Sequence, residues 1–133
     1  MATKTAAQRR VDDKIVYDAF LAACPTRQVV DTIADKWACL VFNALADGAR
    51  RHGELRKAIA GASQKMLTQT LRTLERDGLV SRTLTPAVPV RVDYELTDLG
   101  RDILPVLHAL KEWSESNMES IAAARERYDQ GLP

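Results

Sequence analysis

Long apolar runs are missing from this 133-residue chain. No uninterrupted apolar run exceeds six residues, the length of Trp37–Phe42, and six residues are too few to span a bilayer. The first residues also lack the apolar stretch of a secretory signal, so we expect a cytoplasmic protein without membrane contacts. Its two cysteines, Cys24 and Cys39, are fifteen positions apart and form neither a disulfide framework nor a Cys-x-x-Cys pair. Because no structural zinc spacing occurs either, the sequence predicts no metal site and no cofactor.

Catalytic motifs are missing as well. The sequence contains no G-x-S-x-G, no H-E-x-x-H, no P-loop and no G-x-G-x-x-G. A thiol enzyme built on Cys24 would need a positioned base, and the two histidines, His52 and His108, are distant from it in sequence. We therefore expect that the protein is not an enzyme.

The charge is nearly balanced but unevenly distributed. The whole chain has 19 Lys and Arg residues, 18 Asp and Glu residues and a net charge of +1. The segment from Arg50 to Arg91 holds nine basic and three acidic residues, so it carries +6 and the remainder carries −5. A basic middle between acidic flanks is typical of a nucleic-acid site. An unevenly charged, solvated surface would give the same pattern.

Apolar periodicity divides the chain into helices. At 133 residues and 46% hydrophobic content, we expect one domain. Its stripes recur at helical spacing and end before Pro25 or at Gly48, Gly61 and Gly78, which are typical helix ends. The predicted helices are Ala6–Ala23, Val29–Ala34, Trp37–Leu45, Arg51–Ala60 and a helix that begins after the N-cap Ser63 and ends at Gly78.

Beyond Gly78 the apolar period changes to two. Residues 79–84 and 92–96 read as strands, and the proline-rich residues between them read as a hairpin tip. Thr97 can cap a last helix from about Asp98 to Arg127, and Pro105 should bend it. We expect a mainly α fold with a small β-hairpin wing, that is, a winged helix-turn-helix with extra N- and C-terminal helices.

The helix after Ser63 has two different faces. Leu67, Leu71 and Leu74 form an apolar stripe, and Lys65, Gln69, Arg72 and Arg76 lie opposite it. Thr68 lies beside that polar face and Gln64 lies at its N-terminal tip. Lys and Arg suit guanine edges and phosphates, and Gln suits adenine. A generic amphipathic helix is the plainer interpretation, but this face has no acidic residue before Glu75, which favours DNA.

The chain resembles the HxlR-type regulators, a bacterial winged-helix group related to the MarR-like repressors. The resemblance covers most of the chain from Cys24 to Trp113, in order and with the family's spacing. The matching stretches are Cys24-Pro25, Ile33–Trp37, Arg51–Arg56, Ser63–Arg72, Leu74–Val80, Pro86–Tyr94, Leu96–Gly100, Leu104–Leu107 and Trp113.

The resemblance implies a cytoplasmic homodimer that binds a pseudo-palindromic operator in double-stranded DNA and represses or activates nearby genes. It implies that Ser63, Gln64, Lys65, Thr68, Gln69 and Arg72 enter the major groove. Arg51, Pro86 and Arg91 are the expected wing and backbone contacts. The expected division is 1–24 as N-terminal arm and dimerisation helix, 25–97 as DNA-binding domain and 98–133 as C-terminal dimerisation helix. A winged-helix module for protein–protein contact, without DNA binding, is the alternative.

Several single residues bear on regulation. Cys24 precedes a helix start, where the helix dipole favours a thiolate, and some relatives sense oxidants or electrophiles with a cysteine here. A buried, inert thiol is the alternative for Cys24, and a small ligand is the alternative effector.

We expect Cys39 in the core, because it lies in the apolar run Trp37–Phe42. His52 stands where relatives often have an aromatic residue, and we expect it on the helix-turn-helix surface near a phosphate. We expect His108 to be an ordinary residue of the last helix, and Trp113 and Met118 to pack in the core or in a dimer.

Overall fold

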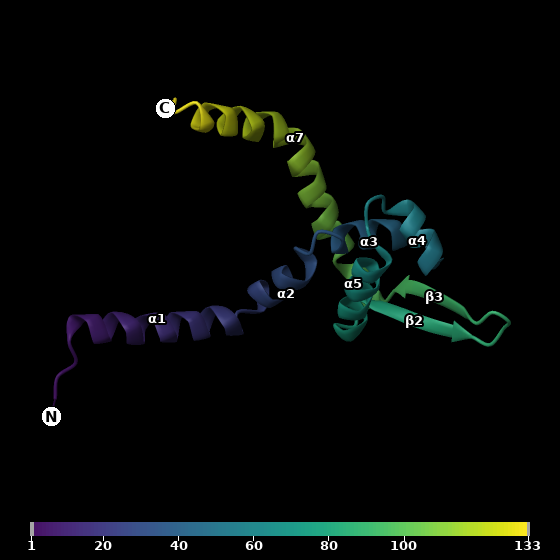
Figure 1. Ribbon diagram of the computed structural model, residues 1–133, viewed down its shortest axis with the longest axis horizontal. Coiled ribbons are helices and arrows are strands. Elements are labelled where there is room, and N and C mark those ends of the chain that lie inside the picture. Colours follow the sequence, from purple (N-terminus) through teal and green to yellow (C-terminus); the bar gives the residue numbers. More distant parts are fainter. Residues whose placement is uncertain (1, 133) are drawn as a thin grey trace.

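A computed structural model describes residues 2–132 and shows a small body from which two helical arms extend (Figure 1). The arms begin and end the chain, and the body between them is built around a three-stranded antiparallel sheet of order β1-β3-β2. The elements are α1 (Ala6–Ala23), α2 (Pro25–Ile33), α3 (Ala38–Leu45), β1 (Arg50–Arg51), α4 (His52–Ala58), α5 (Gln64–Arg76), β2 (Val80–Thr85), β3 (Arg91–Leu96), α6 (Asp98–Asp102) and α7 (Leu104–Asp129). The expected winged helix-turn-helix is confirmed.

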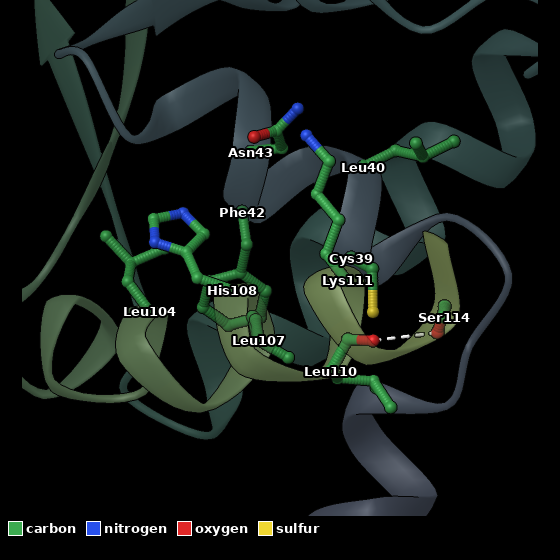
Figure 2. Close-up of a pocket in the computed structure, with 10 residues that line it drawn as sticks. All are labelled: Cys39, Leu40, Phe42, Asn43, Leu104, Leu107, His108, Leu110, Lys111 and Ser114. Atoms are coloured by element: carbon green, nitrogen blue, oxygen red, sulfur yellow. Dashed lines mark hydrogen bonds between the residues drawn. The ribbon is translucent and has the colours of Figure 1, made fainter. Parts of the chain in front are cut away.

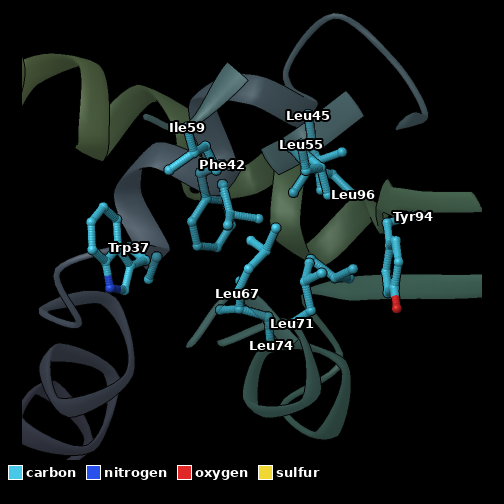
Figure 3. Close-up of a cluster of buried hydrophobic side chains, with 13 residues drawn as sticks. Trp37, Phe42, Leu45, Leu55, Ile59, Leu67, Leu71, Leu74, Tyr94 and Leu96 are labelled. Carbon is cyan, nitrogen blue, oxygen red and sulfur yellow. The ribbon is translucent and has the colours of Figure 1, made fainter. Parts of the chain in front are cut away.

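The apolar core joins α3, α4, α5 and the sheet (Figure 3). The predicted stripe Leu67, Leu71 and Leu74 is buried, each side chain being at most 1% exposed. It packs in one cluster with Phe42 of α3 and Leu96 of β3. Burying these side chains leaves only the opposite face of α5 available to solvent.

Gly78 ends α5 where the sequence predicted. Its φ of +75° is a left-handed conformation that glycine adopts without a Cβ penalty. The turn lets the backbone N–H of Leu79 donate to the Leu74 carbonyl at 2.9 Å, a helix C-cap that leads straight into β2. Helix α5 and strand β2 are therefore rigidly connected.

At the tip of the hairpin each strand is one residue longer than the sequence predicted, since Thr85 pairs with Arg91. The sheet also has a third strand. In β2 and β3 the pairs run from Val80↔Leu96 to Thr85↔Arg91. The third strand, β1, was missed: Arg50 pairs with Tyr94, and Arg51 pairs with Asp93. Two residues are too few to show a period of two. For the same reason the helix predicted from Arg51 begins one residue later, at His52.

The single long C-terminal helix that the sequence predicted is wrong. It is two helices, α6 and α7, which part at Ile103. Thr97 caps α6 as expected, accepting from the Gly100 N–H at 3.1 Å. Pro105 lies in the first turn of α7, where its missing N–H is not needed, so it marks a helix start rather than an internal bend.

The bend of α7 lies further along the helix (Figure 1). In its middle, the Ser114 hydroxyl donates to the Leu110 carbonyl at 2.7 Å, and the Asn117 amide donates to the Trp113 carbonyl at 2.7 Å. Side chains that bond back to the previous turn compete with the backbone ladder and bend helices. Pro105, in the first turn of α7, lies before this bend, whereas the two side-chain bonds lie in the middle of the helix.

Cys39 is exposed, so its expected place in the core is wrong. On α3 the buried residues are Ala38, Val41, Phe42 and Leu45, which share one face at helical spacing. Cys39 and Leu40 fall on the other face, which looks toward the C-terminal arm. An unbroken apolar run cannot tell which face of a short helix is covered.

Gly100 supplies a test of how α6 packs on the body. A Cβ at this position would overlap the Leu79 carbonyl oxygen, whereas a Cβ at Gly53 would meet nothing within 4 Å. Gly100→Ala should therefore lower the free energy of unfolding by about 1–3 kcal/mol. Gly53→Ala, the matched control inside α4, should leave it unchanged or raise it by about 0.5–1 kcal/mol. Urea denaturation of the two variants measures both, and equal stabilities would show that this contact is not tight.

Candidate nucleic-acid interface

The exposed face of α5 begins at a defined N-cap. The Ser63 hydroxyl accepts from the Met66 N–H at 3.1 Å, as the sequence predicted. Capping fixes the start of the helix, and hence which residues occupy its first two turns. Ser63 itself is exposed beside them.

Five predicted site residues share the surface of α5. They line one shallow hollow made by this helix alone: Gln64, Lys65, Thr68, Gln69 and Arg72. No acidic side chain lines it. Glu75, the first acidic residue of α5, pairs with Arg82 of β2 at 3.5 Å. The hollow is therefore a cationic, hydrogen-bonding surface on the side of α5 opposite its buried leucine stripe.

Thr68 is less exposed than the other four, because it has a partner within the protein. His52 Nε2 lies 3.0 Å from Thr68 Oγ1. The imidazole also lies beside the ring of Tyr94, with centroids 6.4 Å apart. His52 is half-buried at the edge of the helix-turn-helix surface, and its expected place near a phosphate stays a prediction. Burial and the nearby Arg56 guanidinium lower the pKa of His52, which keeps its ring neutral near pH 7.

The remaining predicted contacts lie around the hairpin. Pro86 is exposed in the loop between β2 and β3, and Arg91 begins β3. Arg91 Nε donates to Asp93 at 2.9 Å, so part of its charge is neutralised within the strand. Arg51 is exposed on β1, opposite that same Asp93 in the register. The two arginines thus flank one carboxylate.

Cys24 is the single residue between α1 and α2. It is the N-cap residue of α2 and is partly buried. The backbone N–H groups of Arg27 and then Thr26 favour the thiolate and lower the pKa of Cys24 below its usual value. The expected helix-start environment is present.

Cys39 lies in a different environment, at a groove of about 350 Å³ between α3 and α7 (Figure 2). Its thiol donates to the Ile33 carbonyl at 3.3 Å. The lining is mostly apolar, and Asn43, His108 and Lys111 are among its polar members. Within residues 2–132 no group of three or more His, Cys, Asp or Glu side chains could hold a metal ion.

Sequence reasoning placed the α5 face well but missed the contact between His52 and Thr68. The five α5 residues follow from one helical period, which sequence shows directly. His52 comes from α4, and no period connects residues of two helices sixteen positions apart. That contact needed the packing of α4 on α5.

The architecture and the basic face of α5 are those of a winged helix-turn-helix transcription regulator. The HxlR-like helix-turn-helix family model matches residues 32–122. The HTH-type transcriptional regulator YtfH of Escherichia coli (strain K12) is 39% identical over 107 residues, covering 80% of this chain and 85% of that protein. The chain belongs to the HxlR-like family.

Two solved structures show the same fold. The transcriptional regulator YtfH from Salmonella typhimurium matches with a TM-score of 0.72 and 41% identity, covering 81% of this chain and 96% of that one. The redox regulator HypR in its reduced form matches with a TM-score of 0.71 and 38% identity, covering 75% of this chain and 99% of that one. The chain is a DNA-binding transcriptional regulator, and the protein–protein module is not favoured. Within residues 2–132, no helix has the length and apolarity to cross a membrane.

Proposed function

We propose that the protein binds a pseudo-palindromic operator as a homodimer, with α5 of each protomer in the major groove. The observation that carries this proposal is the acid-free hollow on α5, where Lys65, Gln69 and Arg72 are exposed together. Each protomer would read one half-site, with centres about one helical turn (roughly 10–10.5 bp) apart. The role is regulatory rather than catalytic, and we propose that it is exercised in the cytoplasm.

The chemistry of the α5 face fits base edges. Lys65 and Arg72 carry donors suited to guanine O6 and N7, and the Gln64 and Gln69 amides suit adenine N6 and N7. Ser63 and Thr68 add hydroxyls that can donate or accept. Arg51, Pro86 and Arg91 would contact the sugar-phosphate backbone or the minor groove, and these contacts position the protein without reading sequence.

The two arms supply the proposed dimer interface. No residue of α1 or α7 is buried among the described residues. Val11, Ile15, Val16 and Phe20 are all exposed on α1, and Trp113 is 58% exposed on α7. Apolar surfaces of this extent mark interaction sites. A second copy would cover them, which supports residues 1–24 and 98–133 as dimerisation segments around a DNA-binding domain of 25–97.

Cys24 is the proposed redox-responsive site, and a small ligand is the other effector class. It lies at the joint between the proposed dimer helix α1 and the helix α2 that leads to the DNA-binding domain. Its pKa is lowered, and oxidants react with thiolates. The similarity to the redox regulator HypR supports this role. A disulfide or adduct at this joint would tilt the two recognition helices away from half-site spacing.

Replacing α5 side chains should change sequence preference. Lys65→Ala, Gln69→Ala or Arg72→Ala should each weaken operator binding by ~1–3 kcal/mol and relax preference at one base position. Arg91→Ala should instead weaken all sequences alike and reduce the salt slope by about 1. Lys36→Ala removes one positive charge from the turn between α2 and α3, outside the proposed DNA contacts and dimerisation segments, so it serves as the control and should change neither. Selection from genomic fragments, followed by titration at several salt concentrations, measures these effects. The absence of any salt-sensitive preferred fragment would refute the proposal.

Charge placed on the arms should break the dimer. Phe20→Arg and Trp113→Arg each put an unpaired charge into the proposed interface, so we expect monomers at concentrations where the natural protein is dimeric. Val88→Arg changes an equally apolar but fully exposed residue of the hairpin loop and should leave the dimer intact. Sedimentation velocity measures all three. Dimers that persist in both arm variants would place the interface elsewhere.

Oxidation should release the operator through Cys24. Diamide treatment should lower operator affinity by at least ~10²-fold in the natural protein and in Cys39→Ser, because misplaced half-sites lose their avidity. Cys24→Ser should keep full binding under the same treatment, and dithiothreitol should restore the others. Equal loss in Cys24→Ser would remove Cys24 from the mechanism, and no loss in any variant would point to a ligand that is not an oxidant.

A further inference from the structure

Thr68 is the one residue of the α5 hollow whose polar group is shared with another helix. It lies one turn after Gln64 and Lys65 and one turn before Arg72, so it is central in the hollow. Its hydroxyl lies 3.0 Å from His52 Nε2. A hydroxyl has one proton to donate and two lone pairs. The bond to His52 therefore decides which of these remain for a ligand.

His52 is held firmly in place. It is the first residue of α4, and the preceding residue Arg51 pairs with Asp93 in the sheet. Its ring lies 6.4 Å from the ring of Tyr94, which is 9% exposed on β3. The strand, the start of α4 and the buried tyrosine thus fix the imidazole against α5, and Nε2 has little freedom to turn away from Thr68.

The direction of this hydrogen bond has two settings. When Nε2 carries a proton and donates, Thr68 accepts with one lone pair, keeps the other, and can give its own proton outward, to thymine O4 or to guanine O6 or N7. When Nε2 is unprotonated, Thr68 donates to it and offers outward only lone pairs, which suit cytosine N4 or adenine N6. A neutral imidazole permits both settings, whereas a protonated one permits only the first.

We propose that His52 is a positioning residue that sets whether Thr68 acts as a hydrogen-bond donor or acceptor toward the base it meets in the major groove. The inference rests on the proposed function, since it requires α5 to enter that groove. The base preference of Thr68 would then depend on the protonation of His52, although His52 itself contacts no base.

Acidification should increase the preference of Thr68 for thymine over cytosine. Below the pKa of His52 the ring donates only, so the Thr68 proton is always available for thymine O4, whereas one Thr68 lone pair rather than two is left for cytosine N4, and thymine gains relative to cytosine. The direction follows from the hydrogen bond alone, but other charges set the pH at which it occurs. The elements around His52 carry these charged and titratable groups: Arg50 and Arg51 of β1, Glu54, Arg56 and Lys57 of α4, Lys65, Arg72, Glu75 and Arg76 of α5, and Arg91, Asp93, Tyr94 and Glu95 of β3.

The experiment uses the full-length protein and its selected operator. The base position is first found as the one where Thr68→Val, which replaces the hydroxyl by a methyl group of similar shape, changes preference most. Operators with thymine or cytosine there are then compared between pH 8 and a pH below the His52 pKa, which NMR titration of the imidazole measures. In the natural protein the thymine-to-cytosine affinity ratio should rise by about two- to tenfold on acidification, the worth of one hydrogen bond.

Two variants separate this role from simple support of the fold. In His52→Phe, which keeps a ring beside Tyr94, the ratio should not change with pH. In Thr68→Val it should also be constant, and adding His52→Phe to Thr68→Val should alter it no further. A pH-independent ratio in the natural protein, or a shift that survives in Thr68→Val, would overturn the inference. If the natural protein selects no operator at any pH, the proposed function itself has failed.

Discussion

Burial of the leucine stripe of α5 is the constraint on which the rest of the molecule depends. Leu67, Leu71 and Leu74 pack against Phe42 and leave the helix only one orientation relative to the body. Rotating the helix would expose these side chains at a cost of about 1.5–3 kcal/mol each. Burial of the apolar face therefore fixes the direction in which the polar face points. A polar face that is already fixed loses little conformational entropy when the helix enters a DNA groove.

The body and the arms differ in how much apolar surface they bury. The body buries its apolar residues within one chain, and Gly78 and Thr97 connect α5, the hairpin and α6 through short, bonded joints. No residue of α1 or α7 is fully buried, although Leu104 and Leu107 at the start of α7 pack partly against the body. In the proposed homodimer, a rigid DNA-binding body carried on such arms is suited to regulation, because a small change at the joint moves that body as one piece. Cys24, the proposed redox-responsive site, is at that joint, and its pKa is lowered.

Contacts within the protein also change which polar groups of the basic face are available to a ligand. His52 bonds Thr68 from the protein side, Glu75 is occupied by Arg82, and Asp93 is occupied by Arg91. These contacts decide which donors and charges remain free to meet a ligand. A count of positive residues between Arg50 and Arg91 cannot express this, because it treats paired and unpaired groups alike.

The sequence by itself determined the elements whose signal is local. Helical period predicted α1 to its last residue and the stripe of α5, Ser63 was recognised as its cap, and alternation predicted β2 and β3. Tertiary structure decided everything that depends on two elements meeting. It added β1, whose two residues show no period, split the last helix at Ile103, exposed Cys39 and brought His52 to Thr68. The physical reason is that periodicity records which face of an element is apolar, whereas only packing decides what that face meets.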